Sequence, residues 1–164
     1  MNTQVDLMES PIVRTRSDAL HAIFWGGLIA GLLDATDGVI AFGFQGMNPI
    51  QVLQYIASGA LGPAAFNGGL PTALLGMGFH FLIAFTVAGI YYAASRKIPA
   101  LTQNPILWGL SYGVAVYLVM NYGVLPFSAT PKTALSLPLF LNGIIGHALF
   151  VGLPIALYAR RATQ

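Results

Sequence analysis

Six polar side chains interrupt stretches of sequence that are otherwise apolar, and their types could support chemistry. They are Asp34, Asp37, His80, Asn121, Asn142 and His147. An aspartate near the centre of a bilayer costs about 2.5–3.5 kcal/mol on insertion scales, so an intramembrane carboxylate indicates a functional site by default. Chains of aspartate and histidine line proton and ion paths, and imidazole together with carboxylate suits divalent metals.

A structural role is the alternative for each of these residues. Asn and His side chains join membrane helices through hydrogen bonds worth about 0.6–2 kcal/mol each. We expect Asn121 and Asn142 to be such joints, and we interpret His147 as structural too. Asp37 lies one turn from the outer surface, beside a glycine, where a solvated helix end and a site are equal alternatives.

Asp34 and His80 form the pair on which a functional hypothesis depends, because an aspartate is an expensive way to join helices. A conduit for protons, ions or small solutes would use these two side chains. His80 and His147 lie at similar depth on different predicted helices, so they could instead ligate a b-type haem or a metal. Their spacing matches no recognised metal motif and nothing else supports haem. The cofactor therefore stays unknown, and none is favoured.

Several classes of protein are excluded or left without support. The chain has no cysteine, which excludes disulfides, thiolate nucleophiles and Cys-ligated zinc or iron–sulfur sites. It contains no P-loop, no GxSxG elbow and no HExxH motif. An enzyme acting on lipid-soluble substrates stays open, but a non-enzymatic role is favoured. Nucleic acid is not an expected partner, because the net charge is only +2 and forms no basic patch.

The elements that must position these residues are membrane-spanning helices. Of the 164 residues only 7% are charged and 56% are hydrophobic, with a mean hydropathy of +0.73, whereas soluble domains average about 25% charged residues. A span needs about 20 apolar residues, and four windows are long enough: 19–44, 71–94, 105–125 and 137–158. The expected fold class is therefore all-α, a polytopic bundle of four transmembrane helices surrounded by the lipid bilayer.

The four windows form a single expected domain over residues 19–161, between a polar segment at 1–18 and a short tail at 162–164. The apolar character of the first window continues past its two aspartates. We therefore interpret this window as an uncleaved span rather than as a signal peptide.

The first outer loop contains a predicted short helix at 49–60. One face would carry Ile50, Leu53, Ile56, Ala57 and Ala60, and the other would carry Gln51, Gln54 and Ser58. This helix is too short to cross a bilayer, so we expect it to lie at the outer interface or to dip partly into it. The other outer loop should be stiff, because it holds Pro126, Pro131 and Pro138.

Basic residues are distributed unequally between the two sides of such a bundle. One side holds Arg14, Arg16, Arg96, Lys97, Arg160 and Arg161, and the other holds only Lys132. Cytoplasmic loops of membrane proteins carry the excess of Lys and Arg. The pattern therefore predicts that both termini are cytoplasmic.

Small residues recur at helical spacing in every predicted span, and small residues allow membrane helices to approach closely. The stripes contain the glycines Gly27, Gly31, Gly76, Gly109, Gly113, Gly143 and Gly146. Each stripe also carries one of the polar residues, which predicts that the polar groups point inward. Counted at 1.5 Å per residue, His80 lies about 12 Å and His147 about 15 Å from the outer end. The six polar residues could therefore converge in the outer half of the bundle.

Eight segments of the chain resemble a family of small bacterial four-span inner-membrane proteins of unknown function, over about residues 19–161. The segments are Gly31–Asp34, Leu53–Gly59, Gly62–Phe66, Phe79–Ala84, Tyr91–Arg96, Val116–Asn121, Leu125–Ala129 and Val151–Leu157. The chain is more loosely similar to the YagU-like inner-membrane proteins, which share a histidine in span two and a Gly-His pair in span four. The resemblance implies a bacterial, multi-pass inner-membrane protein, and it implies no activity.

Three functional hypotheses follow. The first is a non-enzymatic membrane component that acts as a homo-oligomer or as a partner of another membrane protein in a larger complex. The second is a proton, ion or small-solute conduit that uses Asp34 and His80. The third is a haem- or metal-binding membrane protein that uses His80 and His147.

Overall fold

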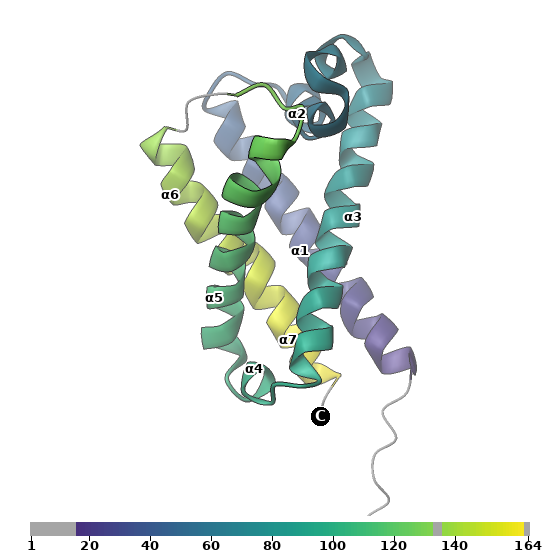
Figure 1. The fold of residues 1–164 in the computed structure, drawn as a ribbon, viewed down its shortest axis with the longest axis vertical. Coiled ribbons are helices and arrows are strands. Elements are labelled where there is room, and N and C mark those ends of the chain that lie inside the picture. The colour runs from purple at the N-terminus through teal and green to yellow at the C-terminus, as the bar shows by residue number, and fades with distance from the viewer. Residues whose placement is uncertain (1–15, 133–135, 163–164) are drawn as a thin grey trace, which may run out of the picture.

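The structure is a computed structural model that describes residues 16–132 and 136–162, and these residues contain helices and no strand (Figure 1). Most of the helical residues belong to long α-helices, connected by shorter helical segments. In chain order the elements are α1 (Arg16–Gly43), α2 (Pro49–Leu61), η1 (Gly62–Asn67), α3 (Gly69–Ser95), α4 (Ala100–Gln103), α5 (Pro105–Leu118), η2 (Val119–Val124), η3 (Leu125–Phe127), α6 (Leu137–Gly146), η4 (His147–Gly152) and α7 (Leu153–Arg161).

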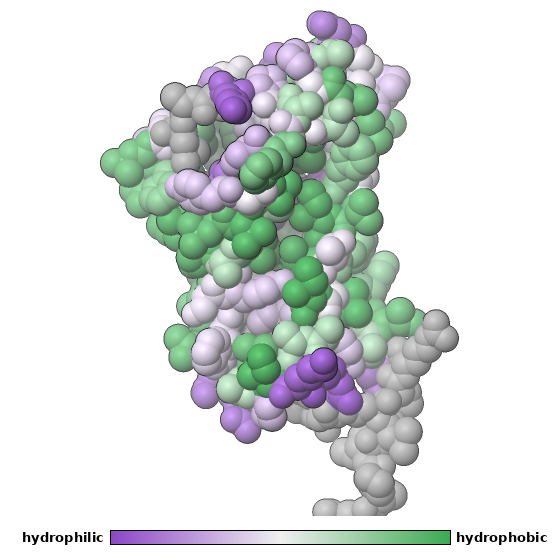
Figure 2. Space-filling model, in the orientation of Figure 1, coloured by the Kyte–Doolittle hydropathy of each residue, from purple (hydrophilic) through white to green (hydrophobic). Residues whose placement is uncertain are grey.

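Four continuous helical runs are long and apolar enough to cross a membrane. They cover Ser17–Gly43, Gly69–Ser95, Pro105–Phe127 and Leu137–Arg161. Hydrophobic residues dominate the middle of the surface in view and hydrophilic residues gather at its two ends (Figure 2). A helix satisfies its own backbone hydrogen bonds, as a lipid environment requires. The predicted all-α bundle of four transmembrane helices is confirmed, and the chain is a multi-pass membrane protein.

The short helix α2 begins and ends at strong local signals. The Asn48 side chain accepts a hydrogen bond from the Gln51 N–H at 3.0 Å, and the Gln51 side chain accepts one from the Asn48 N–H at 2.9 Å. This capping box satisfies two N–H groups that a helix start leaves free, and Pro49 occupies the first turn. Gly62 ends the helix at a φ of 63°, a conformation that favours glycine.

Both faces of α2 make contacts, which differs from the single apolar contact face that its sequence suggested. Gln54 and Ser58 are buried, and the Gln54 amide donates to the Gly69 carbonyl oxygen at 2.9 Å. The backbones of α2 and α3 nearly touch, because a Cβ on Gly76 would collide with the Leu53 carbonyl oxygen. Two of the three residues of the polar face are therefore buried: Gln54 bonds to α3 and Ser58 bonds to the Tyr55 carbonyl oxygen within α2, whereas Gln51 stays exposed.

Two of the four spans contain a π-helical segment, which the sequence analysis did not predict. In span three it is η2, and in span four it is η4. Each ends two residues before a proline, Pro126 and Pro154. Proline lacks an N–H and its ring clashes with the carbonyl four residues earlier, and a wider turn relieves that clash. Pro126 thus lies within the third helical run, and Pro138 lies in the first turn of α6 rather than in a loop.

The two ends of the bundle differ in charge and in the segments that cover them. One end carries Arg96, Lys97, Arg160 and Arg161, together with α4 and the start of α1, and we call it the basic end. The other end carries α2 and Lys132, and we call it the α2 end (Figure 1). The predicted basic residue Arg14 lies outside the described residues.

The four spans pack around a core that lies towards the basic end. Its most buried members are alanines, including Ala88, Ala156 and Ala159, together with Tyr91 and Ile155. Helix α1 packs against α3, η4 and α7, and α5 packs against η4 and α7.

Helices α3 and α5 are joined by tyrosines towards the basic end. The Tyr112 hydroxyl donates to the Val87 carbonyl oxygen at 2.7 Å. The rings of Tyr91 and Tyr112 are 4.9 Å apart, edge to face, and the Tyr91 hydroxyl donates to the Leu101 carbonyl oxygen at 2.9 Å. These bonds close the bundle at this end.

Candidate functional site

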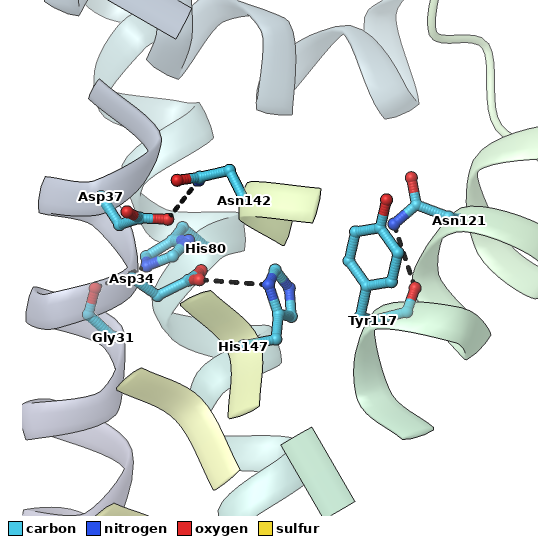
Figure 3. A network of polar contacts seen from close by, with 8 residues as sticks. All are labelled: Gly31, Asp34, Asp37, His80, Tyr117, Asn121, Asn142 and His147. Atoms are coloured by element: carbon cyan, nitrogen blue, oxygen red, sulfur yellow. Dashed lines mark hydrogen bonds and ion pairs between the residues drawn. The ribbon is translucent and has the colours of Figure 1, made fainter. Parts of the chain in front are cut away.

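A cavity of about 550 Å³ lies inside the bundle, and its walls come from all four spans and α2. Most of its lining is apolar. All six polar residues singled out from the sequence line it: Asp34, Asp37, His80, Asn121, Asn142 and His147. Figure 3 shows that Asp34, Asp37, His80, Asn142 and His147 lie close together, whereas Asn121 lies apart from them beside Tyr117.

The side chains of Asp34 of α1 and His147 of η4 face each other in the cavity. Asp34 Oδ1 lies 3.6 Å from His147 Nδ1, and each side chain is 22% exposed. This distance is longer than a hydrogen bond, and His147 Nδ1 is buried without any hydrogen-bond partner. A Cβ on Gly113 would collide with the His147 carbonyl oxygen. Direct backbone contact with α5 therefore fixes the position of this histidine.

A second cross-helix contact joins Asp37 to Asn142 of α6. The Asn142 amide Nδ2 donates to Asp37 Oδ2 at 2.8 Å. Gly146 leaves room for this carboxylate, since a Cβ on Gly146 would lie 2.6 Å from the same oxygen. Asp37 is therefore held by a specific partner and is not a solvated helix end, and Asn142 joins two helices as expected from the sequence.

His80 of α3 contacts the backbone of α1 rather than another polar side chain. Its Nε2 lies 2.8 Å from the Gly31 carbonyl oxygen. A carbonyl only accepts, so Nε2 carries the hydrogen in this contact. The ring also packs edge to face against Phe81. His80 thus bridges α3 and α1 at the cavity wall.

Asn121 and Tyr117 form the remaining polar part of the cavity wall. The Asn121 amide donates to the Tyr117 carbonyl oxygen one turn earlier in the same span, at 3.0 Å. The sequence interpretation expected Asn121 to join two helices. This bond lies within one span, so that expectation is wrong. Tyr117 is only 3% exposed, its hydroxyl has no hydrogen-bond partner, and its ring packs 5.3 Å from that of His147.

Tyr117 is a buried polar residue of the cavity wall that the sequence did not identify as part of a site. It lies four residues after Gly113 and four before Asn121, on the same stripe of span three. Gly143 gives its ring space, because a Cβ there would collide with the ring. The sequence feature that could have identified Tyr117 is its position on a stripe of small and polar residues.

The seven glycines singled out from the sequence all lie opposite a neighbouring helix. Gly27 and Gly31 of α1 lie against Phe85 and Phe81 of α3, and Gly109 lies against Ala156 of α7. At each of these positions an added Cβ would crowd or collide with that neighbour. Close helix contact therefore fixes the frame that holds the cavity residues.

The cavity has an apolar floor and reaches the flank of the bundle. Its floor includes Ala30, Val116 and Val151, which also belong to the buried core below. Two other lining residues, Leu82 of α3 and Val124 of η2, are 63% and 42% exposed. The packed core therefore lies on the basic side of the cavity, and the cavity reaches the exposed flank of the bundle at Leu82 and Val124.

The described residues contain no group of three or more His, Cys, Asp or Glu side chains that could hold a metal ion. His80 Nε2 is engaged with the Gly31 carbonyl, and His147 Nδ1 faces Asp34. Each histidine keeps its other ring nitrogen, His80 Nδ1 and His147 Nε2, outside these contacts.

The fold and the site together define a multi-pass membrane protein with a partly polar cavity inside its bundle. No protein-family model, no curated protein and no solved structure matches the chain. The roles of the cavity residues therefore rest on their geometry and chemistry.

Proposed function

We propose that this protein is a non-enzymatic membrane component that binds a small lipid-soluble molecule within its bundle. The observation that carries the proposal is the cavity, about 550 Å³ in volume and lined by all four spans. Ligand pockets are typically about 300–1,000 Å³, mostly apolar, and contain a few convergent polar groups. The cavity has these three properties.

Buried polar atoms without partners support a bound molecule over a purely structural cluster. A donor or acceptor left unpaired in an apolar interior costs about 1–3 kcal/mol. Tyr117 and His147 each present such an atom at the cavity. A polar group of a ligand, or water, would satisfy both.

A conduit that uses Asp34 and His80 is less well supported. Asp34 does face the cavity, but Ala30, Val116 and Val151 form an apolar floor beneath it. A path through the protein would have to open that packed layer. The metal hypothesis is also less well supported, because the described residues contain no cluster of three ligating side chains. For a haem between His80 and His147, the structure adds only that both histidines line the cavity.

A cavity-filling variant tests the proposed function. Gly38 of α1 lines the cavity, and a Cβ there would meet nothing within 4 Å. Gly38→Phe should therefore fill the cavity without disturbing the helix. Gly78→Phe is the matched control, because Gly78 lies mid-span in α3, is equally open and does not line the cavity.

The measurement is native mass spectrometry of protein purified in mild detergent, which records small molecules that remain bound. We expect a bound molecule on the parent and on Gly78→Phe, and its loss from Gly38→Phe. A parent that carries no adduct, or an adduct equally retained by both variants, would contradict the proposal. The same spectra give the oligomeric state, and we propose a homo-oligomer or a complex with another membrane protein.

We propose the bacterial inner membrane as the location, as the sequence resemblance implies, with the basic end in the cytoplasm. The support is the excess of Lys and Arg at that end. Because the chain has no cysteine, single substitutions Lys132→Cys and Arg161→Cys can report the topology. A membrane-impermeant maleimide applied to spheroplasts should label the first and spare the second, and the reverse result would invert the topology.

A further inference from the structure

We propose that the cavity binds an amphipathic organic cation, with its charged group beside Asp34 and Asp37 and its apolar part towards the exposed flank of the bundle. This inference rests on the proposed function, because it names the class of molecule that the same cavity would hold.

The charge of the cavity is the first argument. Two aspartates line it, and none of its lining residues is a lysine or an arginine. The described basic side chains lie instead in the segments that close the two ends of the bundle. Carboxylates in an apolar interior need a partner of opposite charge or several hydrogen bonds. A bound cation would supply that partner.

The partners of the two aspartates are incomplete, which is the second argument. Asp37 accepts one hydrogen bond, from Asn142 at 2.8 Å, although a carboxylate has about four acceptor positions. Asp34 has His147 at 3.6 Å, beyond hydrogen-bond length. The two aspartates are three residues apart on α1, so their side chains lie on one face of the helix. Acceptor capacity for a cationic donor is therefore left on both.

Two unpaired atoms at the cavity wall, one of them facing Asp34, are an independent argument for a polar ligand group in the cavity. The Tyr117 hydroxyl and His147 Nδ1 are both buried without a partner, and their rings are in contact at 5.3 Å. The hydroxyl oxygen can accept a hydrogen bond, and so can Nδ1 in the neutral ring when Nε2 carries the hydrogen. An ammonium group has three donors and no acceptor, so it matches a set of acceptors.

The rest of the cavity suits an apolar body. Its walls include Phe42, Tyr55 and Phe79 near the α2 end and Leu82 and Val124 at the exposed flank. Aromatic faces also attract organic cations. A molecule that enters from the lipid would keep its tail at that flank and its charged group against the aspartates.

Three amphiphiles of equal chain length test whether binding depends on the charge of the head group. At neutral pH decylamine is a cation, decanol is neutral and decanoate is an anion. Each is titrated into the full-length protein in non-ionic detergent, and one-to-one adducts are quantified by native mass spectrometry. We expect decylamine to bind with an affinity at least about tenfold above that of the other two, as one retained charge-assisted contact would give. Equal binding of decylamine and decanol would overturn the inference, and so would absence of decylamine binding.

Charge-removing variants locate the contact. Asp34→Asn and Asp37→Asn keep the shape of the side chain and should each weaken decylamine binding by about tenfold, without changing decanol binding. Asp18→Asn is the control, because Asp18 lies outside the cavity. Unchanged decylamine binding in a folded Asp34→Asn, Asp37→Asn double variant would overturn the inference. If the variants do not fold, the comparison of the three amphiphiles on the parent still decides.

The failures of the two proposals are distinguishable. Loss of a co-purified molecule in Gly38→Phe combined with no preference for decylamine supports the binding cavity and rejects the cation. Equal adducts in Gly38→Phe and Gly78→Phe reject the binding cavity itself.

Discussion

The two halves of the bundle achieve stability in different ways. Towards the basic end, backbones touch: a Cβ on Gly152 would collide with the Gly109 carbonyl oxygen, and Ala156 is fully buried. Towards the α2 end, the spans surround a cavity of about 550 Å³ that α2 partly covers.

The comparison of the two halves shows that close packing and polar side chains occupy different parts of the bundle. Close backbone contact in lipid depends on small residues, and it leaves no space for side chains between the helices. The polar side chains line the cavity, and some of them are held by a specific hydrogen bond, such as the bond from Asn142 to Asp37. The packed half therefore fixes the frame, and the open half carries the groups that can bind.

Gly152→Ala should have the largest effect on stability, because it acts on the packed half. The new Cβ would collide with the backbone of Gly109 and Gly113, which cannot move aside. We expect a loss of about 3 kcal/mol in the free energy of unfolding, measured by circular dichroism during SDS titration in mixed micelles. The control is Gly89→Ala, where the Cβ meets nothing within 4 Å. Equal stabilities of the two variants would show that α5 and η4 are not in backbone contact.

Gly76→Ala tests the attachment of α2 to the bundle. Its Cβ would collide with the Leu53 carbonyl oxygen, so α2 must move away from α3. We expect about 2 kcal/mol of destabilisation and faster hydrogen exchange across residues 49–61. Gly78→Ala, two residues further along the same helix and in open space, should leave the exchange of α2 unchanged. Slow exchange in both variants would contradict the proposed contact.

Asn142→Ala removes the hydrogen-bond donor of Asp37 and leaves the carboxylate without its partner. An unpaired buried group costs about 1–3 kcal/mol, so we expect a loss in the middle of that range by the same SDS titration. Asn121→Ala should cost less than about 0.5 kcal/mol, because Asn121 bonds only within its own span. Similar losses in the two variants would remove the distinction between these asparagines.

The smallest expected effects compare one tyrosine hydroxyl from each half. Tyr112→Phe removes the bond to the Val87 carbonyl oxygen and should cost about 0.6–1 kcal/mol, as for other hydrogen bonds between membrane helices. Tyr117→Phe removes a hydroxyl that has no partner, so the apo protein should be unchanged or slightly stabilised. A larger loss of stability for Tyr117→Phe than for Tyr112→Phe would contradict the finding that only the Tyr112 hydroxyl is hydrogen-bonded.

The spanning helices could be predicted because hydropathy over about 20 residues reports membrane insertion directly. The observed runs Gly69–Ser95 and Pro105–Phe127 begin and end within two residues of the predicted windows 71–94 and 105–125. The six polar residues of the cavity wall were also named from sequence, because small and polar residues share the inward stripes.

The pairing within the site could not be predicted from the sequence. Which side chains meet depends on the order and rotation of the helices, and a π-helical segment rotates everything that follows it. His147 begins η4 and α7 follows it, so the rotation of His147 relative to the packed helix α7 depends on that segment. The burial of Gln54 could not be predicted either, because it depends on a hydrogen bond to Gly69 of α3. The periodicity of α2 gives no information about that partner.

The exposed part of the cavity wall at Leu82 and Val124 determines from which side of the bilayer a molecule could enter the cavity. It lies between the middle of the bundle and the α2 end, and the floor at Ala30, Val116 and Val151 separates it from the basic end. A molecule dissolved among the acyl chains on the α2 side can reach the cavity by lateral diffusion. A molecule in the opposite leaflet must first cross the bilayer. The occupancy of the proposed site would therefore follow the composition of the leaflet on the α2 side.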